Sequence, residues 1–393
     1  MLFDHEAIAE EVQRRFGAFF RERVNPGARE RDRTGQTFSV DLLQEMAGLG
    51  LIGFTAPVEF GGGGRSWQDW GHALEEIGYH CEDAGVPMLL AYRETATNLI
   101  FRSGIEHLIE RYAVPAVRGE AFIGWLLTEE SDLWSPTTTL ERRGDRLVLN
   151  GKKAASTGGM SCTSWIVYAG IDGDTVAIMV DRDDPGVVVH PVETMGLRSI
   201  GLAELSFEDV ELDASRVLAP SGGLSHGQLF VSERRVTGAS WLLGRMRALI
   251  EKTIDDTEPK VRFGRPLVDY DTFQGSIGRM VLALEMARAS TYRALARAEA
   301  GGGKACIQDP TISAAKYVAV EQALVVADLA QRLTGGHGYF QKHGFDRFLR
   351  DFYGLVPILG SQLAIETGVG ARQIFEQQRR RSTLNRLNPG EST

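Results

Sequence analysis

One stretch constrains the fold more than any other, because it combines a long helical pattern with a sharp corner. Between Gly227 and Ile250 apolar residues recur at helical spacing and form one broad stripe, as a core-facing helix requires. A polar break follows at 255–260, and then comes the turn signal FGRPL at 263–267. A second long apolar pattern runs from about Asp271 to Ala300. The sequence therefore predicts two long helices joined by a cationic, glycine-containing corner.

Composition excludes several classes of protein. The chain of 393 residues has 43 basic and 52 acidic residues, and this net charge of -9 argues against general nucleic-acid binding. The amino terminus lacks the basic and apolar regions of a signal peptide, and no apolar run approaches the roughly 18 residues of a membrane span. The three cysteines are scattered and predict free thiols in a cytoplasmic protein, and the histidines show no metal-ligand spacing. We expect no metal, no membrane partner and no nucleic-acid partner.

The order of patterns along the chain predicts the architecture. The first third reads as amphipathic helices, and Ser66 with Asp69 resembles a capping box that opens one of them. Short alternating runs from about 121 to 217 predict strands, with a hairpin turn at Asp172-Gly173. Long helical patterns then continue to 378, and the polar tail at 377–393 is expected to fray. The predicted fold class is multidomain α+β, with an N-terminal helical domain (1–119), a middle β-barrel or sandwich domain (120–222) and a C-terminal four-helix bundle (223–393).

Seven segments in the same order resemble the acyl-CoA dehydrogenase family. The corner KVRFGRPL at 260–267, followed by Gln274, is similar to the flavin-binding corner of that family. Each segment alone is weak, but together they extend over almost the whole chain. The other six are LGLIGFTAPVEFGG at 49–62, LTE at 127–129, LNGKK at 149–153, MGLRS at 195–199, FEDV at 207–210 and GGHGY at 335–339.

The resemblance implies a cofactor, a substrate and an assembly. Members of the family hold FAD between the middle domain and the C-terminal bundle, and two subunits complete each flavin site. The implied substrate is an acyl-CoA or an acyl-carrier protein, and the implied electron acceptor is electron-transfer flavoprotein or another acceptor. A homodimer or homotetramer is expected.

The resemblance also bears on the catalytic base. Most members carry a glutamate late in the bundle, but Leu359 stands at that position here and cannot carry a proton. A minority place the base on the earlier bundle helix, directly before an arginine, and Glu233 followed by Arg234 matches that pattern. We therefore expect Glu233 to be the base and Arg234 to orient it. The alternative is that the two residues belong to a charged helix face.

The residues implied to contact FAD are spread along the chain, and several positions depart from the family pattern. The loop after Thr128 is shorter than usual, Ala155 replaces a tryptophan, and Lys260 replaces an arginine. Asp271 and Arg332 each replace a glutamine. The predicted cofactor residues are Trp125, Leu127, Thr128, Ser131, Thr157, Lys260, Arg262, Phe263, Asp271, Gln274, Arg332, Gly335, Gly336 and Ser361.

Three functions remain open from the sequence. The first is an FAD-dependent dehydrogenase of an acyl thioester, an oxidoreductase acting on CH–CH groups in specialised fatty acid or polyketide metabolism. Its default product is α,β-unsaturated, with a more distal double bond as the variant. The second is a flavin-dependent monooxygenase on the same fold, which would use reduced flavin and O2. The third is a non-catalytic scaffold, which would be recognised by the absence of bound flavin.

Overall fold

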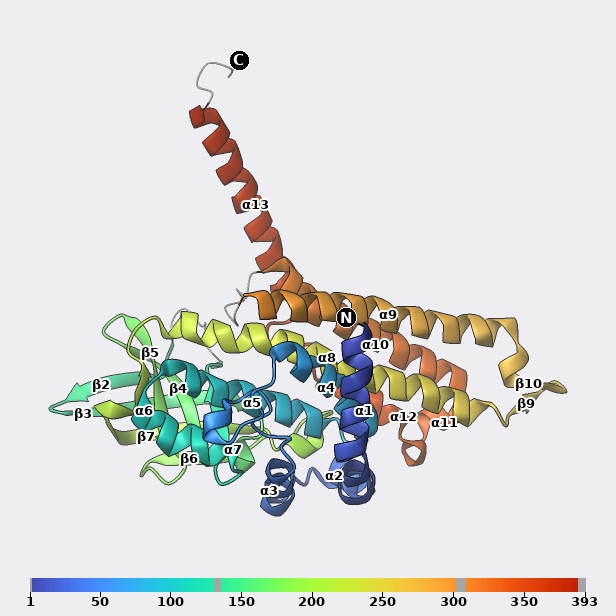
Figure 1. Ribbon diagram of the computed structural model, residues 1–393, viewed down its shortest axis with the longest axis horizontal. Coiled ribbons are helices and arrows are strands. Elements are labelled where there is room, and N and C mark those ends of the chain that lie inside the picture. The colour runs from blue at the N-terminus through green and yellow to red at the C-terminus, as the bar shows by residue number, and fades with distance from the viewer. Residues whose placement is uncertain (1, 131–135, 302–308, 388–393) are drawn as a thin grey trace.

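The chain forms a helical N-terminal part, a central sheet and a long helical C-terminal part (Figure 1). The computed structural model describes residues 2–130, 136–301 and 309–387. The sheet lies at one end of the long axis, and the long helices run from it towards the other end (Figure 1). This arrangement confirms the predicted multidomain α+β class.

The N-terminal part is entirely helical within the described residues. Ser66 accepts a hydrogen bond from the Asp69 backbone N–H and begins α4, which confirms the predicted cap. Helix α5 lies between the sheet and the C-terminal helices, and nearly every one of its side chains is buried. The helices are α1 Leu2–Phe19, α2 Ala28–Thr34, α3 Val40–Gly48, α4 Trp67–His80, α5 Gly85–Ser103, α6 Glu106–Leu108 and α7 Val114–Val117.

The middle part is one mostly antiparallel sheet. In the described residues the hydrogen-bonded order is β6-β7-β3-β2-β4-β5-β8, and β1 pairs in parallel with β4. Asp172 and Gly173 have positive φ values of 51° and 82° and form the predicted tight turn between β4 and β5. The strands are β1 Ile123–Leu126, β2 Thr139–Arg143, β3 Arg146–Ser156, β4 Ser164–Ile171, β5 Asp174–Asp181, β6 Val187–Pro191, β7 Ala203–Asp213 and β8 Val217–Ala219.

The C-terminal part is built around α8, which runs through the centre of the molecule. Helices α8, α9 and α10 pack along one another, and the short β9–β10 hairpin joins α8 to α9 at the end far from the sheet (Figure 1). The elements are α8 Gly223–Thr257, β9 Val261–Arg262, β10 Arg265–Pro266, α9 Asp271–Ala300, α10 Pro310–Thr334, α11 Gly336–Tyr339, α12 Phe345–Tyr353 and α13 Gln362–Leu387.

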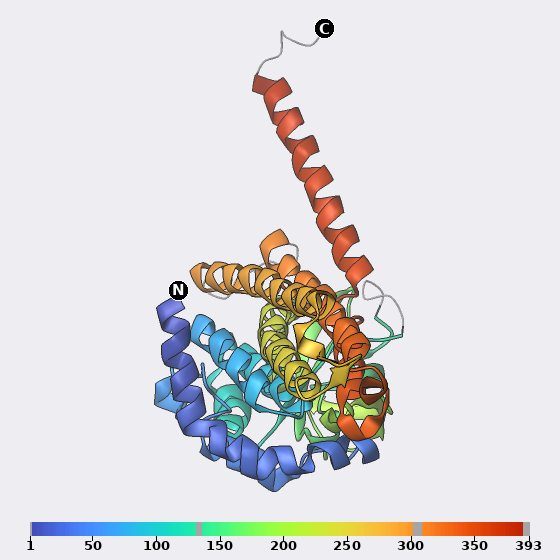
Figure 2. The same ribbon diagram turned by 90° about the vertical axis from the view of Figure 1, so that its right-hand side faces the viewer.

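The last helix corrects two expectations. Helix α13 contacts α10 near its start and then projects away from the body, so it does not complete a four-helix bundle within one chain (Figure 2). The predicted fraying is also wrong for 377–387, where the helix continues to Leu387; the rest of the predicted tail lies outside the described residues. Its polar composition suits a helix surrounded by solvent and gives no local reason for the helix to stop.

Two glycines set the position of α8 against α4. A Cβ atom at Gly244 would lie 1.9 Å from the backbone oxygen of Glu75. A Cβ atom at Gly78 would lie 2.1 Å from the backbone oxygen of Trp241. The two helices therefore approach more closely than larger residues allow, and this contact fixes where the first turns of α8 meet α5 and the sheet.

Candidate active site

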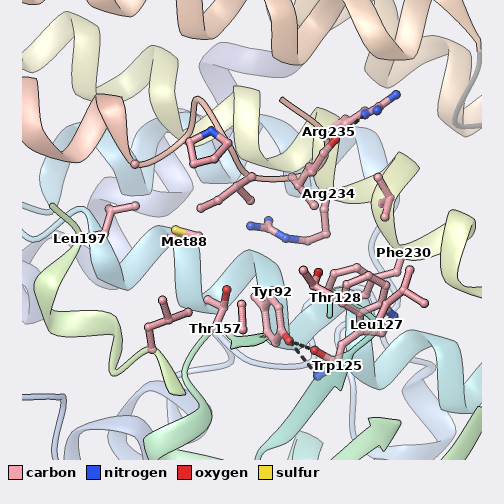
Figure 3. A pocket seen from close by; sticks show the side chains of 18 of the residues that line it. Met88, Tyr92, Trp125, Leu127, Thr128, Thr157, Leu197, Phe230, Arg234 and Arg235 are labelled. Atoms are coloured by element: carbon pink, nitrogen blue, oxygen red, sulfur yellow. Dashed lines mark hydrogen bonds between the residues drawn. The ribbon is translucent and has the colours of Figure 1, made fainter. Parts of the chain in front are cut away.

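A cavity of about 940 Å³ lies where the sheet meets the C-terminal helices. Its walls come from α5, the first third of α8, the ends of β1 and β3, the loop at 354–360 and the first turns of α13 (Figure 3). Ligand and cofactor sites occupy roughly 300–1,000 Å³, so this cavity is large enough for a cofactor together with a substrate.

Aromatic side chains form one rigid wall of the cavity. The Trp125 ring stacks on Phe230 with ring centroids 4.2 Å apart. The Tyr92 hydroxyl donates to the backbone oxygen of Trp125 at 2.7 Å and accepts from its N–H at 2.8 Å (Figure 3). The indole Nε1 donates to the Tyr168 hydroxyl at 3.1 Å. Each polar atom named is satisfied within the wall, which leaves the ring faces to bind apolar or planar groups.

Two threonines present hydroxyl groups to the same cavity. Thr128 follows β1 and Thr157 follows β3, and both side chains line the cavity (Figure 3). The Ala154 N–H donates to the Thr128 backbone oxygen at 3.0 Å, and this bond holds the two strand ends side by side. Ala155, at which the resemblance implies a tryptophan in other members, also lines the cavity.

Glu129 anchors the segment that carries Thr128. Its carboxylate accepts hydrogen bonds from the backbone N–H and hydroxyl of Thr137 at 2.6 and 2.7 Å and forms a buried ion pair with Lys153. Burial alone would raise the pKa of Glu129, but Lys153 and Thr137 outweigh it and lower this pKa to about 2. Glu129 is therefore ionised and committed to the structure, although it lines the cavity.

Two buried cations hold the loop opposite the aromatic wall. Arg235 Nε donates to the Leu359 backbone oxygen at 3.0 Å. Lys316 Nζ donates to the backbone oxygens of Val356 and Gly360 at 3.1 and 3.0 Å. Burial lowers the pKa of Arg235 to about 10 and that of Lys316 to about 8. These side chains support the loop that contains Leu359.

Arg234 has a different position from Arg235, its neighbour in the sequence. Its guanidinium points into the middle of the cavity, whereas Arg235 turns away (Figure 3). Among the described residues, only the Thr237 hydroxyl accepts a hydrogen bond from Arg234, at 3.0 Å. Its buried Nε has no partner in that part of the chain. Burial lowers the pKa of Arg234 to about 10, so the side chain remains a cation at neutral pH.

The structure places the carboxylate of Glu233 outside the cavity. Glu233 is not among the lining residues, and its Oε1 forms an ion pair with Arg102 at the end of α5. Successive residues on a helix are about 100° apart, so when Arg234 faces the cavity, Glu233 faces the neighbouring helix. In this conformation Glu233 therefore does not occupy the position over the substrate that we expect for the base. The two residues do not form an exposed charged face either, because both side chains are buried.

Glu233 nevertheless has the properties of a titrating group. Burial raises its pKa to about 7, although the charge of Arg102 and its hydrogen bond lower it. The second carboxylate oxygen, Oε2, is buried without a partner among the described residues. A carboxyl group with a pKa near neutrality can gain or lose a proton under physiological conditions.

The predicted cofactor residues separate into two groups. Trp125, Leu127, Thr128 and Thr157 line the cavity. Eight others lie beyond the far end of α8, which at 1.5 Å per residue is about 40 Å away. One chain therefore does not bring the two groups together. The distant group is Lys260, Arg262 and Phe263 on the hairpin, Asp271 and Gln274 on α9, and Arg332, Gly335 and Gly336 at the end of α10.

The distant group is largely exposed. Phe263, at the tip of the hairpin, has a positive φ of 49° and is 99% exposed. Arg332 pairs with Asp328 on the surface, and Gly335 and Gly336 are exposed. An aromatic ring held entirely in solvent on a tight turn suggests a surface that is completed by a ligand or a partner.

The last two predicted residues have other positions. Ser361 caps α13, because its hydroxyl accepts from the Ala364 N–H at 3.1 Å next to the cavity-lining Gly360. Ser131 lies outside the described residues.

A histidine cluster that the sequence spacing did not indicate lies near the distant group. The ligand atoms of Asp256, His337 and His343 lie within 4.8 Å of one another. Asp256 also pairs with Lys260, and its other oxygen lies 3.0 Å from His337 Nδ1. Both carboxylate oxygens therefore have protein partners.

The sequence did not reveal the basic residues that form ion pairs with the two buried glutamates of the site. Arg102 was not identified, because its ion pair with Glu233 joins residues far apart in the sequence. Lys153 was noted only as part of a resembling segment, and its pairing with Glu129 was not foreseen. The run SERR at 232–235 does signal a buried polar cluster, because an apolar stripe continues on both sides of it.

Comparison with known proteins identifies the class to which this fold and cavity belong. Three family models match almost the whole chain: the acyl-CoA dehydrogenase N-terminal domain over residues 4–120, the middle domain over 127–210 and the C-terminal domain over 222–374. The chain belongs to the acyl-CoA dehydrogenase family, whose members are FAD-binding oxidoreductases that act on CH–CH bonds.

Individual relatives agree with this assignment. The chain is 28% identical to the probable acyl-CoA dehydrogenase YngJ of Bacillus subtilis over 375 residues, which cover 91% of this chain and 95% of the relative. The butyryl-CoA dehydrogenase structure from Megasphaera elsdenii superposes with a TM-score of 0.87 at 25% identity, covering 93% of this chain and 98% of that one. A glutaryl-CoA dehydrogenase from Mycobacterium smegmatis, solved in complex with FADH2, shares the fold with a TM-score of 0.86 at 23% identity, covering 94% of each chain.

The residues present fit a flavin in the cavity. The cavity offers a flat aromatic wall and two hydroxyl groups, which suit a planar heterocycle with polar edges. Neither the Thr128 nor the Thr157 hydroxyl has a protein partner within the described part of the chain, so both can bond to a ligand.

Among the described residues, no helix is long and apolar enough to cross a membrane.

Proposed function

We propose that this protein is an FAD-dependent dehydrogenase that removes two hydrogens from an acyl thioester, with α,β-desaturation as the default. The observation that carries the proposal is the cavity of about 940 Å³ in a chain of this family, with mostly apolar walls and two threonine hydroxyls that have no protein partner in the described part of the chain. Apolar walls accommodate an acyl chain, and the hydroxyls suit the polar edge of the flavin. When bound, FAD supplies the acceptor for the hydride that leaves the β-carbon.

Glu233 is our proposed base, reached when its side chain leaves Arg102 and turns towards the cavity. Its pKa of about 7 suits a group that accepts a proton near neutral pH. It adjoins Arg234, whose guanidinium already lies in the cavity. The two carboxylates that do line the cavity in the described residues are less suitable, because Glu129 is held by Lys153 and Glu193 is exposed.

A dimer in which each chain completes the other's flavin site would account for the two separated groups of cofactor residues. Phe263 and its neighbours would then meet the distal part of the FAD that is bound in the partner's cavity. The substrate is an acyl-CoA or an acyl-carrier protein, and the electrons pass to electron-transfer flavoprotein or another acceptor. Cross-linking or light scattering of the purified protein tests the dimer directly.

The test of the proposed function is spectroscopic. The purified protein should show a flavin band near roughly 450 nm, and an acyl-CoA or acyl-carrier thioester added without oxygen should bleach it. The double bond in the product then gives the regiochemistry. A protein that retains flavin but is bleached by no thioester in the panel would contradict the proposal. The monooxygenase alternative is not favoured, because the relatives compared above are dehydrogenases.

A further inference from the structure

A buried cation lies behind one wall of the cavity. Arg93 is on α5, directly after the cavity-lining Tyr92, and it is 2% exposed. None of its three guanidinium nitrogens has a hydrogen-bond partner among the described residues. The ionisable groups that act on it are Cys162 and Tyr92, and both are neutral because burial raises the pKa of each. Within the described part of the chain, no carboxylate therefore balances the charge of Arg93.

The surroundings of Arg93 offset only part of the cost of burying it. The central carbon of its guanidinium lies 4.1 Å from the centroid of the Phe122 ring, which is a favourable cation–π contact. Burial by itself does not deprive an arginine of hydrogen bonds, because the equally buried Arg245 donates to the backbone oxygen of Cys81 at 2.6 Å. A buried ion without such partners is costly, and its presence points to a role outside the stability of the fold.

The turn that carries Thr157 separates Arg93 from the cavity. Thr157 and Tyr92 both line the cavity, and Gly158 follows Thr157 with a positive φ of 70° (Figure 3). A Cβ atom on Gly158 would lie 2.5 Å from Leu89 Cδ1 and 3.7 Å from Nη2 of Arg93. Glycine therefore lets the turn rest directly on α5 at this point. The guanidinium and the turn lie next to each other, with no side chain of Gly158 between them.

We infer that Arg93 acts through space on the bound flavin, stabilises its reduced form and so raises its midpoint potential. A hydride brings two electrons and one proton from the β-carbon to the flavin, so the ring gains one negative charge, while the α-proton goes to the base. A fixed cation behind a dry wall favours that charge, and a carboxylate paired with Arg93 would cancel the effect. This inference rests on the part of the proposed function that places FAD in the cavity.

The test measures the equilibrium between oxidised and reduced flavin and does not depend on turnover. FAD-loaded protein is reduced stepwise by dithionite without oxygen, beside a redox dye of known potential, and both spectra are followed. Two unit charges on the order of 12 Å apart in a protein shift such an equilibrium by about tenfold. We expect Arg93→Met to lower the ratio of reduced to oxidised flavin about tenfold, which is about 30 mV for a two-electron couple. An unchanged midpoint potential would overturn the inference.

Two further variants separate the charge of Arg93 from its shape. Arg93→Lys keeps the charge and should retain most of the potential of the unmodified protein. Arg245→Met is the matched control, because it removes a guanidinium of the same burial that contacts Gly78 on α4 and Phe348 on α12. This control should leave the midpoint potential unchanged. If Arg93→Lys lowers the potential as much as Arg93→Met, the charge is not the cause and the inference fails.

Stability distinguishes this role from a structural one. Arg93→Met removes a buried ion without a partner, so it should not lower the urea midpoint of the oxidised, FAD-loaded protein. A lower urea midpoint with an unchanged potential would show that Arg93 is structural.

The outcomes also distinguish this inference from the proposed function. If thioesters bleach the flavin but the potential is the same in Arg93→Met, the dehydrogenase proposal stands and the role of Arg93 is wrong. If the potential falls in Arg93→Met but no thioester bleaches the flavin, the role of Arg93 stands and the proposed function fails.

Discussion

Two buried glutamates near the cavity show how the number of hydrogen-bond donors decides the role of a carboxylate. Glu129 receives Lys153 and the hydroxyl and N–H of Thr137, and its pKa is lowered to about 2. Within the described residues Glu233 has one cationic partner, Arg102, and one oxygen without any partner, and its pKa is raised to about 7. Burial raises the pKa of both, and more so for the more deeply buried Glu233, while the additional donors lower the pKa of Glu129. One carboxylate is a permanent anchor, and the other can exchange a proton.

The comparison also gives opposite dependences of stability on pH. The pKa of Glu129 lies below its ordinary value of 4.5, so its contribution is fully present above that pH and is lost as pH falls towards about 2. The pKa of Glu233 lies above 4.5, so the folded state holds the proton more tightly than the unfolded state. Its contribution is greatest below 4.5 and is lost as pH rises to about 7.

The largest expected effect comes from removing Lys153, the ion-pair partner of Glu129. Lys153→Met leaves Glu129 buried without its cation and should lower the free energy of unfolding by about 3–5 kcal/mol. Urea denaturation measures this loss. Lys152→Met, on the exposed neighbour, is the control and should change stability by less than about 0.5 kcal/mol. Equal stabilities of the two variants would show that the pair does not anchor this segment.

The second prediction concerns the titrating carboxylate. Glu233→Gln keeps the shape of the side chain but removes the base, so the rate of flavin bleaching by thioester should fall about 100-fold or more. Stopped-flow absorbance under anaerobic conditions measures it. Glu30→Gln, on an exposed glutamate of α2, serves as control. An unchanged rate in Glu233→Gln would refute the base assignment.

The third prediction concerns the pH dependence of the rate at which the flavin is bleached. If Glu233 is the base, the bleaching rate should rise with pH through about 7, because only the ionised form accepts a proton. Arg102 lowers the pKa of Glu233, so Arg102→Met should move this limb to higher pH. Arg111→Met, which removes a surface ion pair with Asp181, should not move it. If the pH at which the bleaching rate rises is unchanged in Arg102→Met, the group that titrates is not Glu233.

The smallest expected effect comes from removing one hydrogen-bond donor to the carboxylate of Glu129. Thr137→Val removes the hydroxyl that donates to Glu129 but retains the backbone N–H, and should cost about 1 kcal/mol of stability. The same variant should raise the pKa of Glu129 and shift the acid-induced loss of stability to higher pH. Denaturation across acidic pH checks both results. A loss as large as that of Lys153→Met would mean that the hydroxyl, not the ion pair, dominates.

Much of the fold could be predicted because its signals are local. The apolar stripe from Gly227, the Ser66 cap and the Asp172-Gly173 turn each depend on residues a few positions apart, and the structure has each where the pattern indicates. The course of α13 could not be predicted, because its composition is compatible with both a packed and a projecting helix.

The sequence by itself determined the order of helices and strands, the family and therefore the cofactor. The tertiary structure decided which face of α8 meets the cavity. Helical periodicity places Glu233 and Arg234 about 100° apart but does not say which of them faces the substrate. That choice depends on α5, which brings Arg102 to Glu233 from far along the chain. It depends also on the loop of Leu359, whose backbone oxygen accepts a hydrogen bond from Arg235. Local spacing fixes the directions of side chains relative to one another, whereas their partners come from distant segments that only packing brings together.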